Sequence, residues 1–202
     1  MESLIFEMEY NKNKKEIILD KELNNLDKFA FDFFNIAVKY VDCVIISGYV
    51  SILLGRSRIT EDVDIFIKKI PKETFELFYN DLVSNGFWCI NSDNPETLFD
   101  YLKDGLAIRF AHGKSPMPNM EVKFPKDKLD EDAFEDAIAV KLPEREIKIS
   151  SLERHIAFKK YFLGSEKDDE DALHIEELFK KDIDYGKIKK LQKLIKLRKN
   201  EI

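Results

Sequence analysis

The stretch VIISGYVSILLGRSRITEDVDIFI, residues 44–67, joins two apolar runs through a segment that contains glycine and arginine. The first run, 43–48 (CVIISG), is β-branched and ends in glycine, which predicts a buried strand. Residues 48–54 predict a short helix that Gly55 ends, because glycine is favoured just past a helix C-terminus. The second run, 62–67 (DVDIFI), predicts the next strand, although it carries two carboxylates.

Asp62 and Asp64 lie two residues apart in this second strand. Side chains alternate between the faces of a strand, so the two carboxylates share one face while Val63 and Ile65 enter the core. Adjacent carboxylates repel each other, and the pKa of one rises unless a cation neutralises the pair. Hard oxygen ligands suit Mg²⁺, which commonly takes one or two carboxylates together with substrate phosphates. The pair therefore predicts a site for Mg²⁺ or Mn²⁺.

The residues before this pair predict a phosphate site. Ser47 and Gly48 fall where a strand gives way to a helix, and the free N–H groups and helix dipole there attract a phosphate. Glycine also permits close approach to the backbone. Arg56 and Arg58 are candidates for holding further phosphate oxygens. A phosphate site followed by a metal-binding carboxylate pair is typical of phosphoryl or nucleotidyl transfer.

The stretch resembles the signature of DNA polymerase β-like nucleotidyltransferases, in which a Gly-Gly or Gly-Ser turn and a spacer precede Asp-x-Asp on a strand. It is more similar to the branch that contains AbiEii-type toxins, with Gly-Gly-x-Ala, an apolar turn, Gly, then Arg-x-Thr-x-Asp-x-Asp. The matching positions are Gly48, Gly55, Arg58, Thr60, Asp62 and Asp64. Ser47 replaces the first glycine of the pattern, and Val50 replaces its small alanine.

The resemblance implies a third carboxylate on a later strand. Glu121 in 120–124 (MEVKF) is the candidate for this metal ligand, at a place where the family often has Asp. Asp100, Asp104 and Asp127 are placed less well, because they lie in predicted helices or turns.

The segment 151–175 (SLERHIAFKKYFLGSEKDDEDALHI) resembles a later motif of the same branch. In that motif, a Ser-Leu-x-x-x-Ile-Ala-x-Lys helix is followed by Lys-Asp-x-x-Asp on the next helix. The matching residues are Lys159, Lys167, Asp168 and Asp171, of which the two aspartates share one helix face. By resemblance, Lys159 contacts nucleotide phosphates, and the Lys-Asp group either lines the site or fixes the tail against it.

The whole pattern predicts an α/β (α+β) nucleotidyltransferase fold with a short mixed sheet flanked by helices. Residues 1–149 form the expected core, with an amphipathic helix at about 24–40, and residues 150–202 form a helical C-terminal region. Ser150 to Glu153 fits a capping box. Further strands are expected at 87–90, 106–113, 119–124, 137–142 and 145–150. Further helices are expected between Pro71 and Gly86, and at 96–103, 153–163, 169–181 and 184–199.

Composition narrows the class of protein. The 202 residues carry a formal net charge of -6, which disfavours broad nucleic-acid coating but leaves a local basic groove possible, as on the lysine-rich last helix. Two cysteines, Cys43 and Cys89, sit in apolar surroundings and are expected to be free thiols. The histidines lack zinc spacing, and 166–177 lacks the mid-loop glycine of a calcium loop. No signal pattern or long apolar run is present, so we expect a cytoplasmic protein without membrane contact.

These features together predict Mg²⁺-dependent transfer of a nucleoside monophosphate from an NTP to a hydroxyl. By resemblance the acceptor is the 3′ end of tRNA or another RNA, with a protein hydroxyl as the alternative. A toxin-like enzyme would also have a neutralising antitoxin protein as its partner. A nucleotide-binding regulatory module without chemistry is the alternative of a different class, and the intact acidic trio argues against it.

Overall fold

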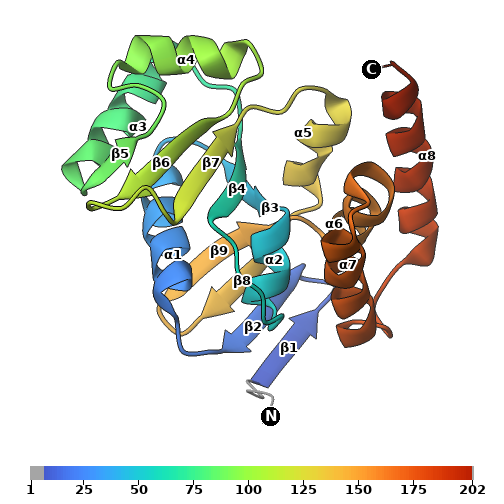
Figure 1. Cartoon of the computed structure of the whole chain (residues 1–202). Coiled ribbons are helices and arrows are strands. Elements are labelled where there is room, and N and C mark those ends of the chain that lie inside the picture. The colour runs from blue at the N-terminus through green and yellow to red at the C-terminus, as the bar shows by residue number, and fades with distance from the viewer. Residues whose placement is uncertain (1–6, 202) are drawn as a thin grey trace.

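The computed structural model describes residues 7–201, and in that range a nine-stranded mixed sheet crosses the molecule (Figure 1). The strand order is β1-β2-β8-β9-β3-β4-β7-β6-β5. The strands are β1 (Glu7–Asn11), β2 (Glu16–Asp20), β3 (Cys43–Ile46), β4 (Asp62–Ile67), β5 (Phe87–Cys89), β6 (Ile108–His112), β7 (Asn119–Lys123), β8 (Ile138–Leu142) and β9 (Arg145–Ile149). The mixed α/β class is as expected.

The expectation of a short sheet is wrong, because residues 7–20 add a hairpin at one edge. β1 pairs with β2 in antiparallel fashion, and β2 pairs with β8 in parallel. In β2, Ile17 and Leu19 enter the core, whereas Ile18 between them is exposed. An apolar residue at an exposed position hides the alternation that would have identified the strand.

Helices cover both faces of the sheet. They are α1 (Asn25–Ala37), α2 (Gly48–Leu53), α3 (Lys72–Ser84), α4 (Pro95–Lys103), α5 (Lys128–Glu135), α6 (Leu152–Phe158), the π-helical turn η1 (Lys159–Leu163), α7 (Glu166–Leu178) and α8 (Tyr185–Glu201). Asn24 caps α1 in a capping box with Asp27, because asparagine readily accepts from the free N–H groups of a helix start. Helix α5 was not anticipated, because its sequence KLDEDAFE is mostly charged.

An aromatic core lies between the sheet and helices α1 and α3. The Phe33 ring of α1 contacts Phe78 of α3 and Phe110 of β6, with centroids 5.9 and 5.7 Å apart. Phe110 is the register partner of Met120, which pairs in turn with Val63. Residues on this face are therefore apolar, and the alternate residues of β4 and β7 face the other side of the sheet.

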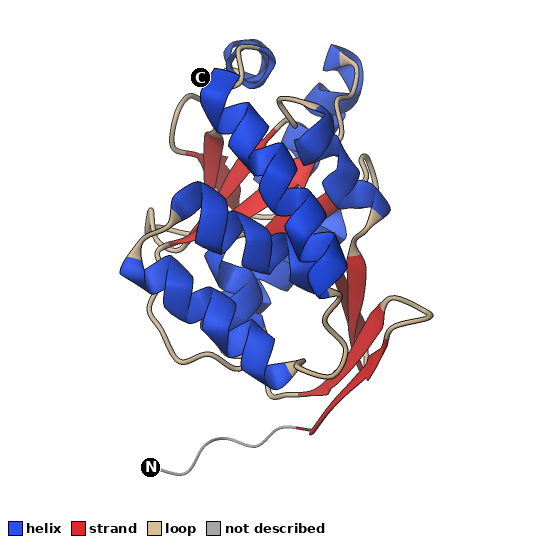
Figure 2. Cartoon of the chain, turned by 90° about the vertical axis from the view of Figure 1, so that its right-hand side faces the viewer, coloured by secondary structure: helices blue, strands red, loops and turns tan. Residues whose placement is uncertain are grey.

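Helices α6, α7 and α8 gather on one side of the molecule (Figure 1), the side that faces the viewer in Figure 2. The expected capping box at the start of α6 is wrong: Ser151 is the N-cap, and its side chain accepts from the Arg154 N–H. Glu153 instead accepts from the Asp184 N–H, in the loop before α8, at 3.1 Å. The expected helix 153–163 changes to π-helical geometry at Lys159, and the next helix starts at Glu166, earlier than expected, with a capping box from Ser165.

Cys43 and Cys89 are buried free thiols, as expected. Within residues 7–201, no helix combines the length and the hydropathy needed to cross a membrane.

Candidate active site

Strands β4 and β7 bring the predicted carboxylates together. The two strands are parallel, with Asp64 opposite Glu121 and Asp62 opposite Asn119. All four residues are out of phase with the apolar residues of the same strands, so they lie on the face away from the aromatic core. The sheet therefore presents an acidic face where β4 and β7 run side by side.

Two basic residues neutralise part of this acidic face, and neither was foreseen. Lys123 Nζ lies 2.7 Å from Asp64 Oδ1 and also pairs with Glu121 Oε1. Arg109, the partner of Glu121 in β6, pairs with Glu121 Oε2. The sequence carries a signal for Lys123, because a lysine two residues after Glu121 must leave the strand on the same face.

The electrostatics differ between the two paired carboxylates. Burial raises the pKa of Asp64 above its ordinary value, and the contact with Lys123 only partly offsets this. Burial also raises the pKa of Glu121, but its contacts with Lys123 and Arg109 outweigh that effect and leave the pKa lowered. The pKa of Lys123 is raised, because Asp64 and Glu121 outweigh the burial that lowers it.

The carboxylate oxygens of the acidic face are the type of ligand that hard divalent cations prefer. Asp62, Asp64 and Glu121 offer only oxygen ligands, and the ammonium of Lys123 shows that a cation is stabilised between two of them. Asp62 is exposed, and Thr60 Oγ1 donates to its Oδ1 at 3.1 Å. In the described part of the chain, no three Asp, Glu, His or Cys side chains already converge as a ready ligand set. A metal would therefore be held by these carboxylates only after their side chains rearrange.

Ser47 and Gly48 lie at the junction of β3 and α2, as predicted, where Ser47 borders the pocket and Gly48 lies against Arg58. Ser47 has φ 61°, in the left-handed region that favours glycine, at the position where the family pattern has glycine. Gly48 is buried, and a Cβ placed on it would meet Arg58 Nη2 at 2.5 Å. The absence of a side chain at Gly48 thus makes room for the guanidinium of Arg58, and Ser47 is the residue of this turn that borders the pocket.

Asp171 is fully buried and accepts from Arg56, from Arg58 at 2.6 Å and from Lys159 at 2.9 Å. Lys159 also pairs with Asp168 at 2.7 Å. This motif cluster, made by these five residues, joins the loop before β4 to helices α6 and α7.

Results

Sequence analysis

The stretch VIISGYVSILLGRSRITEDVDIFI, residues 44–67, joins two apolar runs through a segment that contains glycine and arginine. The first run, 43–48 (CVIISG), is β-branched and ends in glycine, which predicts a buried strand. Residues 48–54 predict a short helix that Gly55 ends, because glycine is favoured just past a helix C-terminus. The second run, 62–67 (DVDIFI), predicts the next strand, although it carries two carboxylates.

Asp62 and Asp64 lie two residues apart in this second strand. Side chains alternate between the faces of a strand, so the two carboxylates share one face while Val63 and Ile65 enter the core. Adjacent carboxylates repel each other, and the pKa of one rises unless a cation neutralises the pair. Hard oxygen ligands suit Mg²⁺, which commonly takes one or two carboxylates together with substrate phosphates. The pair therefore predicts a site for Mg²⁺ or Mn²⁺.

The residues before this pair predict a phosphate site. Ser47 and Gly48 fall where a strand gives way to a helix, and the free N–H groups and helix dipole there attract a phosphate. Glycine also permits close approach to the backbone. Arg56 and Arg58 are candidates for holding further phosphate oxygens. A phosphate site followed by a metal-binding carboxylate pair is typical of phosphoryl or nucleotidyl transfer.

The stretch resembles the signature of DNA polymerase β-like nucleotidyltransferases, in which a Gly-Gly or Gly-Ser turn and a spacer precede Asp-x-Asp on a strand. It is more similar to the branch that contains AbiEii-type toxins, with Gly-Gly-x-Ala, an apolar turn, Gly, then Arg-x-Thr-x-Asp-x-Asp. The matching positions are Gly48, Gly55, Arg58, Thr60, Asp62 and Asp64. Ser47 replaces the first glycine of the pattern, and Val50 replaces its small alanine.

The resemblance implies a third carboxylate on a later strand. Glu121 in 120–124 (MEVKF) is the candidate for this metal ligand, at a place where the family often has Asp. Asp100, Asp104 and Asp127 are placed less well, because they lie in predicted helices or turns.

The segment 151–175 (SLERHIAFKKYFLGSEKDDEDALHI) resembles a later motif of the same branch. In that motif, a Ser-Leu-x-x-x-Ile-Ala-x-Lys helix is followed by Lys-Asp-x-x-Asp on the next helix. The matching residues are Lys159, Lys167, Asp168 and Asp171, of which the two aspartates share one helix face. By resemblance, Lys159 contacts nucleotide phosphates, and the Lys-Asp group either lines the site or fixes the tail against it.

The whole pattern predicts an α/β (α+β) nucleotidyltransferase fold with a short mixed sheet flanked by helices. Residues 1–149 form the expected core, with an amphipathic helix at about 24–40, and residues 150–202 form a helical C-terminal region. Ser150 to Glu153 fits a capping box. Further strands are expected at 87–90, 106–113, 119–124, 137–142 and 145–150. Further helices are expected between Pro71 and Gly86, and at 96–103, 153–163, 169–181 and 184–199.

Composition narrows the class of protein. The 202 residues carry a formal net charge of -6, which disfavours broad nucleic-acid coating but is compatible with a local basic groove, as on the lysine-rich last helix. Two cysteines, Cys43 and Cys89, sit in apolar surroundings and are expected to be free thiols. The histidines lack zinc spacing, and 166–177 lacks the mid-loop glycine of a calcium loop. The sequence shows no signal pattern or long apolar run, so we expect a cytoplasmic protein without membrane contact.

These features together predict Mg²⁺-dependent transfer of a nucleoside monophosphate from an NTP to a hydroxyl. By resemblance the acceptor is the 3′ end of tRNA or another RNA, with a protein hydroxyl as the alternative. A toxin-like enzyme would also have a neutralising antitoxin protein as its partner. A nucleotide-binding regulatory module without chemistry is the alternative of a different class, and the intact acidic trio argues against it.

Overall fold

The computed structural model describes residues 7–201, and in that range a nine-stranded mixed sheet crosses the molecule (Figure 1). The strand order is β1-β2-β8-β9-β3-β4-β7-β6-β5. The strands are β1 (Glu7–Asn11), β2 (Glu16–Asp20), β3 (Cys43–Ile46), β4 (Asp62–Ile67), β5 (Phe87–Cys89), β6 (Ile108–His112), β7 (Asn119–Lys123), β8 (Ile138–Leu142) and β9 (Arg145–Ile149). The mixed α/β class is as expected.

The expectation of a short sheet is wrong, because residues 7–20 add a hairpin at one edge. β1 pairs with β2 in antiparallel fashion, and β2 pairs with β8 in parallel. In β2, Ile17 and Leu19 enter the core, whereas Ile18 between them is exposed. An apolar residue at an exposed position hides the alternation that would have identified the strand.

Helices cover both faces of the sheet. They are α1 (Asn25–Ala37), α2 (Gly48–Leu53), α3 (Lys72–Ser84), α4 (Pro95–Lys103), α5 (Lys128–Glu135), α6 (Leu152–Phe158), the π-helical turn η1 (Lys159–Leu163), α7 (Glu166–Leu178) and α8 (Tyr185–Glu201). Asn24 caps α1 in a capping box with Asp27, because asparagine readily accepts from the free N–H groups of a helix start. Helix α5 was not anticipated, because its sequence KLDEDAFE is mostly charged.

An aromatic core lies between the sheet and helices α1 and α3. The Phe33 ring of α1 contacts Phe78 of α3 and Phe110 of β6, with ring centroids 5.9 and 5.7 Å apart. Phe110 is the register partner of Met120, which pairs in turn with Val63. Residues on this face are therefore apolar, and the alternate residues of β4 and β7 face the other side of the sheet.

Helices α6, α7 and α8 gather on one side of the molecule (Figure 1), the side that faces the viewer in Figure 2. The expected capping box at the start of α6 is wrong: Ser151 is the N-cap, and its side chain accepts from the Arg154 N–H. Glu153 instead accepts from the Asp184 N–H, in the loop before α8, at 3.1 Å. The glutamate is therefore used to hold the start of α8 rather than the start of its own helix.

The boundaries of the next two helices also differ from the expected ones. The expected helix 153–163 changes to π-helical geometry at Lys159. The following helix starts at Glu166, earlier than expected, because Ser165 caps it in a capping box with Asp168.

Cys43 and Cys89 are buried free thiols, as expected. Within residues 7–201, no helix combines the length and the hydropathy needed to cross a membrane.

Candidate active site

Strands β4 and β7 bring the predicted carboxylates together. The two strands are parallel, with Asp64 opposite Glu121 and Asp62 opposite Asn119. These residues alternate with the apolar residues of the same strands, so they lie on the face away from the aromatic core. We call this part of the sheet, carrying Asp62, Asp64 and Glu121, the acidic face.

Two basic residues neutralise part of the acidic face, and neither was foreseen. Lys123 Nζ lies 2.7 Å from Asp64 Oδ1 and also pairs with Glu121 Oε1. Arg109, the partner of Glu121 in β6, pairs with Glu121 Oε2. The sequence does carry a signal for Lys123, because a lysine two residues after Glu121 must leave the strand on the same face.

The electrostatics differ between the two paired carboxylates. Burial raises the pKa of Asp64 above its ordinary value, and the contact with Lys123 only partly offsets this. Burial also raises the pKa of Glu121, but its contacts with Lys123 and Arg109 outweigh that effect and leave the pKa lowered. Lys123 thus favours the charged form of both carboxylates, and burial opposes this most successfully at Asp64.

The carboxylate oxygens of the acidic face are the type of ligand that hard divalent cations prefer. Asp62, Asp64 and Glu121 offer only oxygen ligands, and the ammonium of Lys123 shows that a cation is stabilised between two of them. Asp62 is exposed, and Thr60 Oγ1 donates to its Oδ1 at 3.1 Å. In the described part of the chain, no three Asp, Glu, His or Cys side chains already converge as a ready ligand set. The three carboxylates would therefore hold a metal only after their side chains rearrange.

Ser47 and Gly48 lie at the junction of β3 and α2, where Ser47 borders the pocket and Gly48 lies against Arg58. Ser47 has φ 61°, in the left-handed region that favours glycine, at the position where the family pattern has glycine. Gly48 is buried, and a Cβ placed on it would meet Arg58 Nη2 at 2.5 Å. The missing side chain of Gly48 thus makes room for the guanidinium of Arg58, and Ser47 is the residue of this turn that borders the pocket described below.

The basic and acidic residues of the two sequence motifs meet in one buried group. Asp171 is fully buried and accepts from Arg56, from Arg58 at 2.6 Å and from Lys159 at 2.9 Å. Lys159 also pairs with Asp168 at 2.7 Å. We call these five residues the motif cluster. It joins the loop before β4 to helices α6 and α7.

The predicted Lys-Asp group therefore fixes the tail against the core. Lys167 takes part through its backbone carbonyl, which accepts from Arg56 Nη1 at 3.0 Å. Arg56 and Arg58, which the sequence offers as phosphate ligands, are both committed to Asp171. Lys159 is committed as well, although it also borders the pocket.

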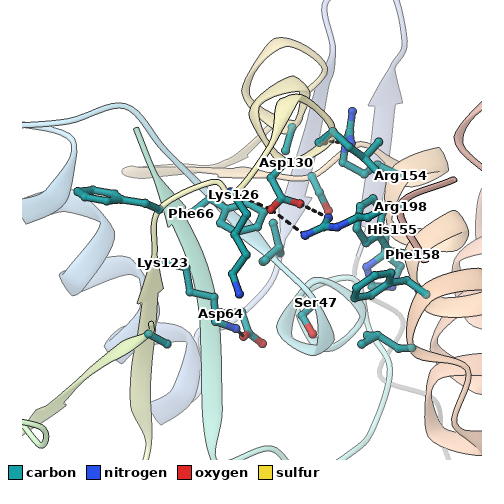
Figure 3. Close-up of a pocket in the computed structure, with 18 of the residues that line it drawn as sticks. Ser47, Asp64, Phe66, Lys123, Lys126, Asp130, Arg154, His155, Phe158 and Arg198 are labelled. Carbon is teal, nitrogen blue, oxygen red and sulfur yellow. Dashed lines mark hydrogen bonds and ion pairs between the residues drawn. The ribbon is translucent and has the colours of Figure 1, made fainter. Parts of the chain in front are cut away.

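A pocket of about 450 Å³ lies between the acidic face and the helical tail (Figure 3). Its volume falls within the range of small-molecule sites, about 300–1,000 Å³. Figure 3 shows Lys123 and Lys126 extending toward Asp64. Its polar lining includes Ser47, Asp64, Lys123, Lys126 and Lys159, and its apolar lining includes Phe66, Leu106, Leu129, Phe158 and Phe162.

The far wall of the pocket was not predicted. Arg198 of α8 holds the buried Asp130 of α5 with two N–H groups, at 2.7 and 3.3 Å. Its guanidinium also lies over the Phe162 ring, 5.0 Å from the centroid.

Results

Sequence analysis

The stretch VIISGYVSILLGRSRITEDVDIFI, residues 44–67, joins two apolar runs through a segment that contains glycine and arginine. The first run, 43–48 (CVIISG), is β-branched and ends in glycine, which predicts a buried strand. Residues 48–54 predict a short helix that Gly55 ends, because glycine is favoured just past a helix C-terminus. The second run, 62–67 (DVDIFI), predicts the next strand, although it carries two carboxylates.

Asp62 and Asp64 lie two residues apart in this second strand. Side chains alternate between the faces of a strand, so the two carboxylates share one face while Val63 and Ile65 enter the core. Adjacent carboxylates repel each other, and the pKa of one rises unless a cation neutralises the pair. Hard oxygen ligands suit Mg²⁺, which commonly takes one or two carboxylates together with substrate phosphates. The pair therefore predicts a site for Mg²⁺ or Mn²⁺.

The residues before this pair predict a phosphate site. Ser47 and Gly48 fall where a strand gives way to a helix, and the free N–H groups and helix dipole there attract a phosphate. Glycine also permits close approach to the backbone. Arg56 and Arg58 are candidates for holding further phosphate oxygens. A phosphate site followed by a metal-binding carboxylate pair is typical of phosphoryl or nucleotidyl transfer.

The stretch resembles the signature of DNA polymerase β-like nucleotidyltransferases, in which a Gly-Gly or Gly-Ser turn and a spacer precede Asp-x-Asp on a strand. It is more similar to the branch that contains AbiEii-type toxins, with Gly-Gly-x-Ala, an apolar turn, Gly, then Arg-x-Thr-x-Asp-x-Asp. The matching positions are Gly48, Gly55, Arg58, Thr60, Asp62 and Asp64. Ser47 replaces the first glycine of the pattern, and Val50 replaces its small alanine.

The resemblance implies a third carboxylate on a later strand. Glu121 in 120–124 (MEVKF) is the candidate for this metal ligand, at a place where the family often has Asp. Asp100, Asp104 and Asp127 are placed less well, because they lie in predicted helices or turns.

The segment 151–175 (SLERHIAFKKYFLGSEKDDEDALHI) resembles a later motif of the same branch. In that motif, a Ser-Leu-x-x-x-Ile-Ala-x-Lys helix is followed by Lys-Asp-x-x-Asp on the next helix. The matching residues are Lys159, Lys167, Asp168 and Asp171, of which the two aspartates share one helix face. By resemblance, Lys159 contacts nucleotide phosphates, and the Lys-Asp group either lines the site or fixes the tail against it.

The whole pattern predicts an α/β (α+β) nucleotidyltransferase fold with a short mixed sheet flanked by helices. Residues 1–149 form the expected core, with an amphipathic helix at about 24–40, and residues 150–202 form a helical C-terminal region. Ser150 to Glu153 fits a capping box. Further strands are expected at 87–90, 106–113, 119–124, 137–142 and 145–150. Further helices are expected between Pro71 and Gly86, and at 96–103, 153–163, 169–181 and 184–199.

Composition narrows the class of protein. The 202 residues carry a formal net charge of -6, which disfavours broad nucleic-acid coating but is compatible with a local basic groove, as on the lysine-rich last helix. Two cysteines, Cys43 and Cys89, sit in apolar surroundings and are expected to be free thiols. The histidines lack zinc spacing, and 166–177 lacks the mid-loop glycine of a calcium loop. The sequence shows no signal pattern or long apolar run, so we expect a cytoplasmic protein without membrane contact.

These features together predict Mg²⁺-dependent transfer of a nucleoside monophosphate from an NTP to a hydroxyl. By resemblance the acceptor is the 3′ end of tRNA or another RNA, with a protein hydroxyl as the alternative. A toxin-like enzyme would also have a neutralising antitoxin protein as its partner. A nucleotide-binding regulatory module without chemistry is the alternative of a different class, and the intact acidic trio argues against it.

Overall fold

The computed structural model describes residues 7–201, and in that range a nine-stranded mixed sheet crosses the molecule (Figure 1). The strand order is β1-β2-β8-β9-β3-β4-β7-β6-β5. The strands are β1 (Glu7–Asn11), β2 (Glu16–Asp20), β3 (Cys43–Ile46), β4 (Asp62–Ile67), β5 (Phe87–Cys89), β6 (Ile108–His112), β7 (Asn119–Lys123), β8 (Ile138–Leu142) and β9 (Arg145–Ile149). The mixed α/β class is as expected.

The expectation of a short sheet is wrong, because residues 7–20 add a hairpin at one edge. β1 pairs with β2 in antiparallel fashion, and β2 pairs with β8 in parallel. In β2, Ile17 and Leu19 enter the core, whereas Ile18 between them is exposed. An apolar residue at an exposed position hides the alternation that would have identified the strand.

Helices cover both faces of the sheet. They are α1 (Asn25–Ala37), α2 (Gly48–Leu53), α3 (Lys72–Ser84), α4 (Pro95–Lys103), α5 (Lys128–Glu135), α6 (Leu152–Phe158), the π-helical turn η1 (Lys159–Leu163), α7 (Glu166–Leu178) and α8 (Tyr185–Glu201). Asn24 caps α1 in a capping box with Asp27, because asparagine readily accepts from the free N–H groups of a helix start. Helix α5 was not anticipated, because its sequence KLDEDAFE is mostly charged.

An aromatic core lies between the sheet and helices α1 and α3. The Phe33 ring of α1 contacts Phe78 of α3 and Phe110 of β6, with ring centroids 5.9 and 5.7 Å apart. Phe110 is the register partner of Met120, which pairs in turn with Val63. Residues on this face are therefore apolar, and the alternate residues of β4 and β7 face the other side of the sheet.

Helices α6, α7 and α8 gather on one side of the molecule (Figure 1), the side that faces the viewer in Figure 2. The expected capping box at the start of α6 is wrong: Ser151 is the N-cap, and its side chain accepts from the Arg154 N–H. Glu153 instead accepts from the Asp184 N–H, in the loop before α8, at 3.1 Å. The glutamate therefore holds the start of α8 rather than the start of its own helix.

The boundaries of the next two helices also differ from the expected ones. The expected helix 153–163 changes to π-helical geometry at Lys159. The following helix starts at Glu166, earlier than expected, because Ser165 caps it in a capping box with Asp168.

Cys43 and Cys89 are buried free thiols, as expected. Within residues 7–201, no helix combines the length and the hydropathy needed to cross a membrane.

Candidate active site

Strands β4 and β7 bring the predicted carboxylates together. The two strands are parallel, with Asp64 opposite Glu121 and Asp62 opposite Asn119. These residues alternate with the apolar residues of the same strands, so they lie on the face away from the aromatic core. We call this part of the sheet, which carries Asp62, Asp64 and Glu121, the acidic face.

Two basic residues neutralise part of the acidic face, and neither was foreseen. Lys123 Nζ lies 2.7 Å from Asp64 Oδ1 and also pairs with Glu121 Oε1. Arg109, the partner of Glu121 in β6, pairs with Glu121 Oε2. The sequence does carry a signal for Lys123, because a lysine two residues after Glu121 must leave the strand on the same face.

The electrostatics differ between the two paired carboxylates. Burial raises the pKa of Asp64 above its ordinary value, and the contact with Lys123 only partly offsets this. Burial also raises the pKa of Glu121, but its contacts with Lys123 and Arg109 outweigh that effect and leave the pKa lowered. Lys123 thus favours the charged form of both carboxylates, and burial opposes this most strongly at Asp64.

The carboxylate oxygens of the acidic face are the type of ligand that hard divalent cations prefer. Asp62, Asp64 and Glu121 offer only oxygen ligands, and the ammonium of Lys123 shows that a cation is stabilised between two of them. Asp62 is exposed, and Thr60 Oγ1 donates to its Oδ1 at 3.1 Å. In the described part of the chain, no three Asp, Glu, His or Cys side chains already converge as a ready ligand set. The three carboxylates would therefore hold a metal only after their side chains rearrange.

Ser47 and Gly48 lie at the junction of β3 and α2, where Ser47 borders the pocket and Gly48 lies against Arg58. Ser47 has φ 61°, in the left-handed region that favours glycine, at the position where the family pattern has glycine. Gly48 is buried, and a Cβ placed on it would meet Arg58 Nη2 at 2.5 Å. The missing side chain of Gly48 thus makes room for the guanidinium of Arg58. Ser47 is the residue of this turn that borders the pocket described below.

The basic and acidic residues of the two sequence motifs meet in one buried group. Asp171 is fully buried and accepts from Arg56, from Arg58 at 2.6 Å and from Lys159 at 2.9 Å. Lys159 also pairs with Asp168 at 2.7 Å. We call these five residues the motif cluster. It joins the loop before β4 to the helical tail.

In this arrangement the Lys-Asp group fixes the tail against the core. Lys167 takes part through its backbone carbonyl, which accepts from Arg56 Nη1 at 3.0 Å. Arg56 and Arg58, which the sequence offers as phosphate ligands, both bind Asp171. Lys159 binds the same carboxylate, although it also borders the pocket.

A pocket of about 450 Å³ lies between the acidic face and the helical tail (Figure 3). Its volume falls within the range of small-molecule sites, about 300–1,000 Å³. Figure 3 shows Lys123 and Lys126 extending toward Asp64. The polar lining includes Ser47, Asp64, Lys123, Lys126 and Lys159, and the apolar lining includes Phe66, Leu106, Leu129, Phe158 and Phe162.

The far wall of the pocket was not predicted. Arg198 of α8 holds the buried Asp130 of α5 with two N–H groups, at 2.7 and 3.3 Å. The Arg198 guanidinium also lies over the Phe162 ring, 5.0 Å from its centroid. Asp130 and Arg198 are 68 positions apart in the sequence, so no local pattern indicates that they meet.

His155 borders the same pocket and makes the protein sensitive to acid. Burial lowers the pKa of His155 to about 3, and its Nε2 lies 2.9 Å from Ser51 Oγ. The unfolded chain binds this proton below about pH 6.5, whereas the folded chain does not. Stability is therefore lost as the pH falls from about 6.5 toward 3, at about 1.4 kcal/mol per pH unit.

We expect the free energy of unfolding to fall by about 2 kcal/mol between pH 7 and pH 5 through His155 alone. Urea denaturation of the wild type and of His155→Gln, at both pH values, measures this contribution. Glutamine can accept from Ser51 but takes up no proton, so the variant should lose about 2 kcal/mol less than the wild type over this interval. An equal loss in both proteins would contradict the assignment.

No family model and no curated protein matches this chain. Among solved structures, it is similar to the crystal structure of an antigenic nucleotidyltransferase-like protein from Paracoccidioides brasiliensis, with a TM-score of 0.51 and 14% sequence identity. The match covers 86% of this chain and 88% of that chain. The chain therefore has a nucleotidyltransferase-like fold, and its place in the AbiEii-type branch stays a prediction.

Proposed function

We propose that the chain is a nucleotidyltransferase that moves a nucleoside monophosphate from an NTP to a hydroxyl acceptor, with Mg²⁺ or Mn²⁺ as its cofactor. The observation that supports this most is the register of β4 and β7. It sets Asp64, which borders a pocket large enough for a nucleotide, beside Glu121. The nucleotidyltransferase-like fold supports the same reaction class.

Each group of residues has a part in this proposal. Asp62, Asp64 and Glu121 would hold the divalent cation, which supplies Lewis-acid stabilisation and lowers the pKa of the acceptor hydroxyl. Ser47 would hold the terminal phosphates of the NTP beside the divalent cation, and the ammonium of Lys126 would neutralise part of their charge. The apolar walls of the pocket would enclose the nucleoside and keep water away from the phosphates.

RNA, including the 3′ end of tRNA, is the acceptor we propose. Helix α8 carries exposed lysines that have no ion-pair partner among residues 7–201, namely Lys189, Lys190, Lys193 and Lys196. Arg198 of the same helix borders the pocket, so this basic helix runs up to the site. A local basic surface on an otherwise acidic protein favours a polyanionic acceptor over a neutral one. In a toxin-like role the protein would also bind an antitoxin.

The test offers each α-³²P-labelled NTP to the purified protein with Mg²⁺ and total RNA, and resolves RNA and protein on separate gels. We expect label on RNA, and no label after EDTA or in the Asp64→Asn variant. Label on protein in place of RNA would identify a protein hydroxyl as the acceptor. Absence of label from both contradicts the proposal.

A nucleotide-binding module without chemistry is the second candidate. The ion pairs of Lys123 with Asp64 and Glu121 favour it, because they neutralise two of the three carboxylates without any metal. Calorimetric titration with Mg²⁺ and a non-hydrolysable NTP separates the two functions when no label is transferred. Heat of binding without transfer of label would support the module.

A further inference from the structure

Lys123 occupies the position between two carboxylates where the proposed function needs a metal. Its Nζ contacts Asp64 Oδ1 at 2.7 Å and pairs with Glu121 Oε1, while Arg109 pairs with the second Glu121 oxygen. Two buried or half-buried negative charges thus meet the positive charges of Lys123 and of the more exposed Arg109. The side chains of Asp64 and Glu121 are only 17% and 10% exposed, so water screens these contacts weakly.

A divalent cation would need the same carboxylate oxygens that Lys123 already contacts. An ammonium and a metal ion cannot share them closely, because like charges at such a distance repel strongly in a partly buried site. Lys123 must therefore leave before Asp64 and Glu121 can both face a metal. Its departure is favourable only where the ammonium finds another anionic partner.

The pocket offers such a partner when a nucleotide is bound. Lys123 borders the pocket together with Ser47 and Lys126 (Figure 3). Phosphates bound in the pocket would therefore lie near the Lys123 ammonium. A lysine carries its charge on a flexible four-carbon stem with three rotatable donors, and can exchange one oxygen partner for another. Asp64 itself remains in β4, where the backbone pairs with β3 and β7 hold it.

We propose that Lys123 is an exchangeable internal cation, which neutralises Asp64 and Glu121 in the nucleotide-free protein and moves to the nucleotide phosphates when a divalent cation binds. This inference rests on the proposed function for the identity of the ligand. Its consequence is that metal and nucleotide bind cooperatively. The metal alone binds weakly, and each ligand raises the affinity of the other by the same factor.

The test measures Mn²⁺ binding by electron paramagnetic resonance without nucleotide, in three variants and the wild type. Lys123→Met keeps an unbranched side chain that is one atom shorter and removes its charge, and should bind Mn²⁺ at least about tenfold more tightly than the wild type. Lys123→Arg keeps the charge and should bind as weakly as the wild type. Lys68→Met is the matched control, because Lys68 directly follows β4 but pairs with Asp42, at 3.1 Å, and does not line the pocket.

A non-hydrolysable NTP provides the second measurement. It should raise the Mn²⁺ affinity of the wild type by about tenfold or more, and that of Lys123→Met by much less. Circular dichroism checks that each variant is folded, and Mn²⁺ should raise the melting temperature of Lys123→Met more than that of the wild type.

Equal Mn²⁺ affinity in the wild type and Lys123→Met would overturn the inference, as would absence of Mn²⁺ binding in both. Neither titration requires turnover. A protein that transfers no label but binds Mn²⁺ more tightly as Lys123→Met would therefore contradict the proposed function and support the exchange of Lys123. Transfer of label together with equal Mn²⁺ affinities in the wild type and Lys123→Met would support the proposed function and contradict the exchange of Lys123.

Discussion

The Asp64→Asn variant is expected to lose nucleotidyl transfer by at least about 10³-fold, the upper end of what the loss of one charge-stabilising group costs. Asp64 lies beside Glu121 and borders the pocket, and its substitution removes one of three carboxylates from the proposed metal site. Asparagine keeps the shape of the side chain but not its charge. Initial rates with the labelled NTP and the acceptor, at saturating Mg²⁺, measure the loss.

Two controls separate this loss from unfolding. Asp100→Asn makes the same chemical change at an exposed carboxylate outside the pocket, which pairs with Lys103 at 2.8 Å, and should keep wild-type activity. The melting temperature of Asp64→Asn should stay close to that of the wild type, because Glu121 still holds Lys123 and Asp64 makes few other contacts. Activity within a factor of about ten of the wild type would rule out the proposed role of Asp64.

The Asp171→Asn variant is expected to lose about 3–5 kcal/mol of stability, the usual cost of removing one partner from a buried ionic group. Asp171 is fully buried and binds Arg56, Arg58 and Lys159. Without its charge, three cations remain with only Asp168 and the more exposed Glu170 to balance them. Urea denaturation followed by circular dichroism gives the free energy of unfolding.

Glu170→Gln is the matched control for this variant. Glu170 precedes Asp171 in α7 and also pairs with Arg56, but its side chain is 60% exposed. Exposed ion pairs contribute little, so we expect a loss below about 1 kcal/mol. Similar losses in the two variants would show that burial of the motif cluster does not decide its strength.

Local patterns predicted the elements around the acidic face well. The strand 62–67 has the expected bounds, because Val63, Ile65 and Ile67 occupy every second position and all three are buried. The pairing of Asp64 with Glu121 could be anticipated only through the family resemblance, since strand register is a long-range property.

Other features could not be read from the sequence for physical reasons. The hairpin that contains Ile18 lacks a clean alternation, and the charged helix α5 has a narrow apolar side. Arg58 was interpreted as a phosphate ligand, because a basic residue near a glycine turn has that role in many sites. Its actual partner, Asp171, is 113 positions away in the chain, so only the tertiary fold brings the two together.

The contact of Arg198 with Asp130 determines when the pocket is complete during synthesis of the chain. During synthesis, the segment that carries the acidic face leaves the ribosome long before α8 does, and proteins begin to fold from their N-terminal side. The far wall of the pocket is missing until residues up to Arg198 have emerged. A growing chain therefore lacks the finished pocket, and the proposed activity would begin only after the helices that follow residue 150 have been translated and docked.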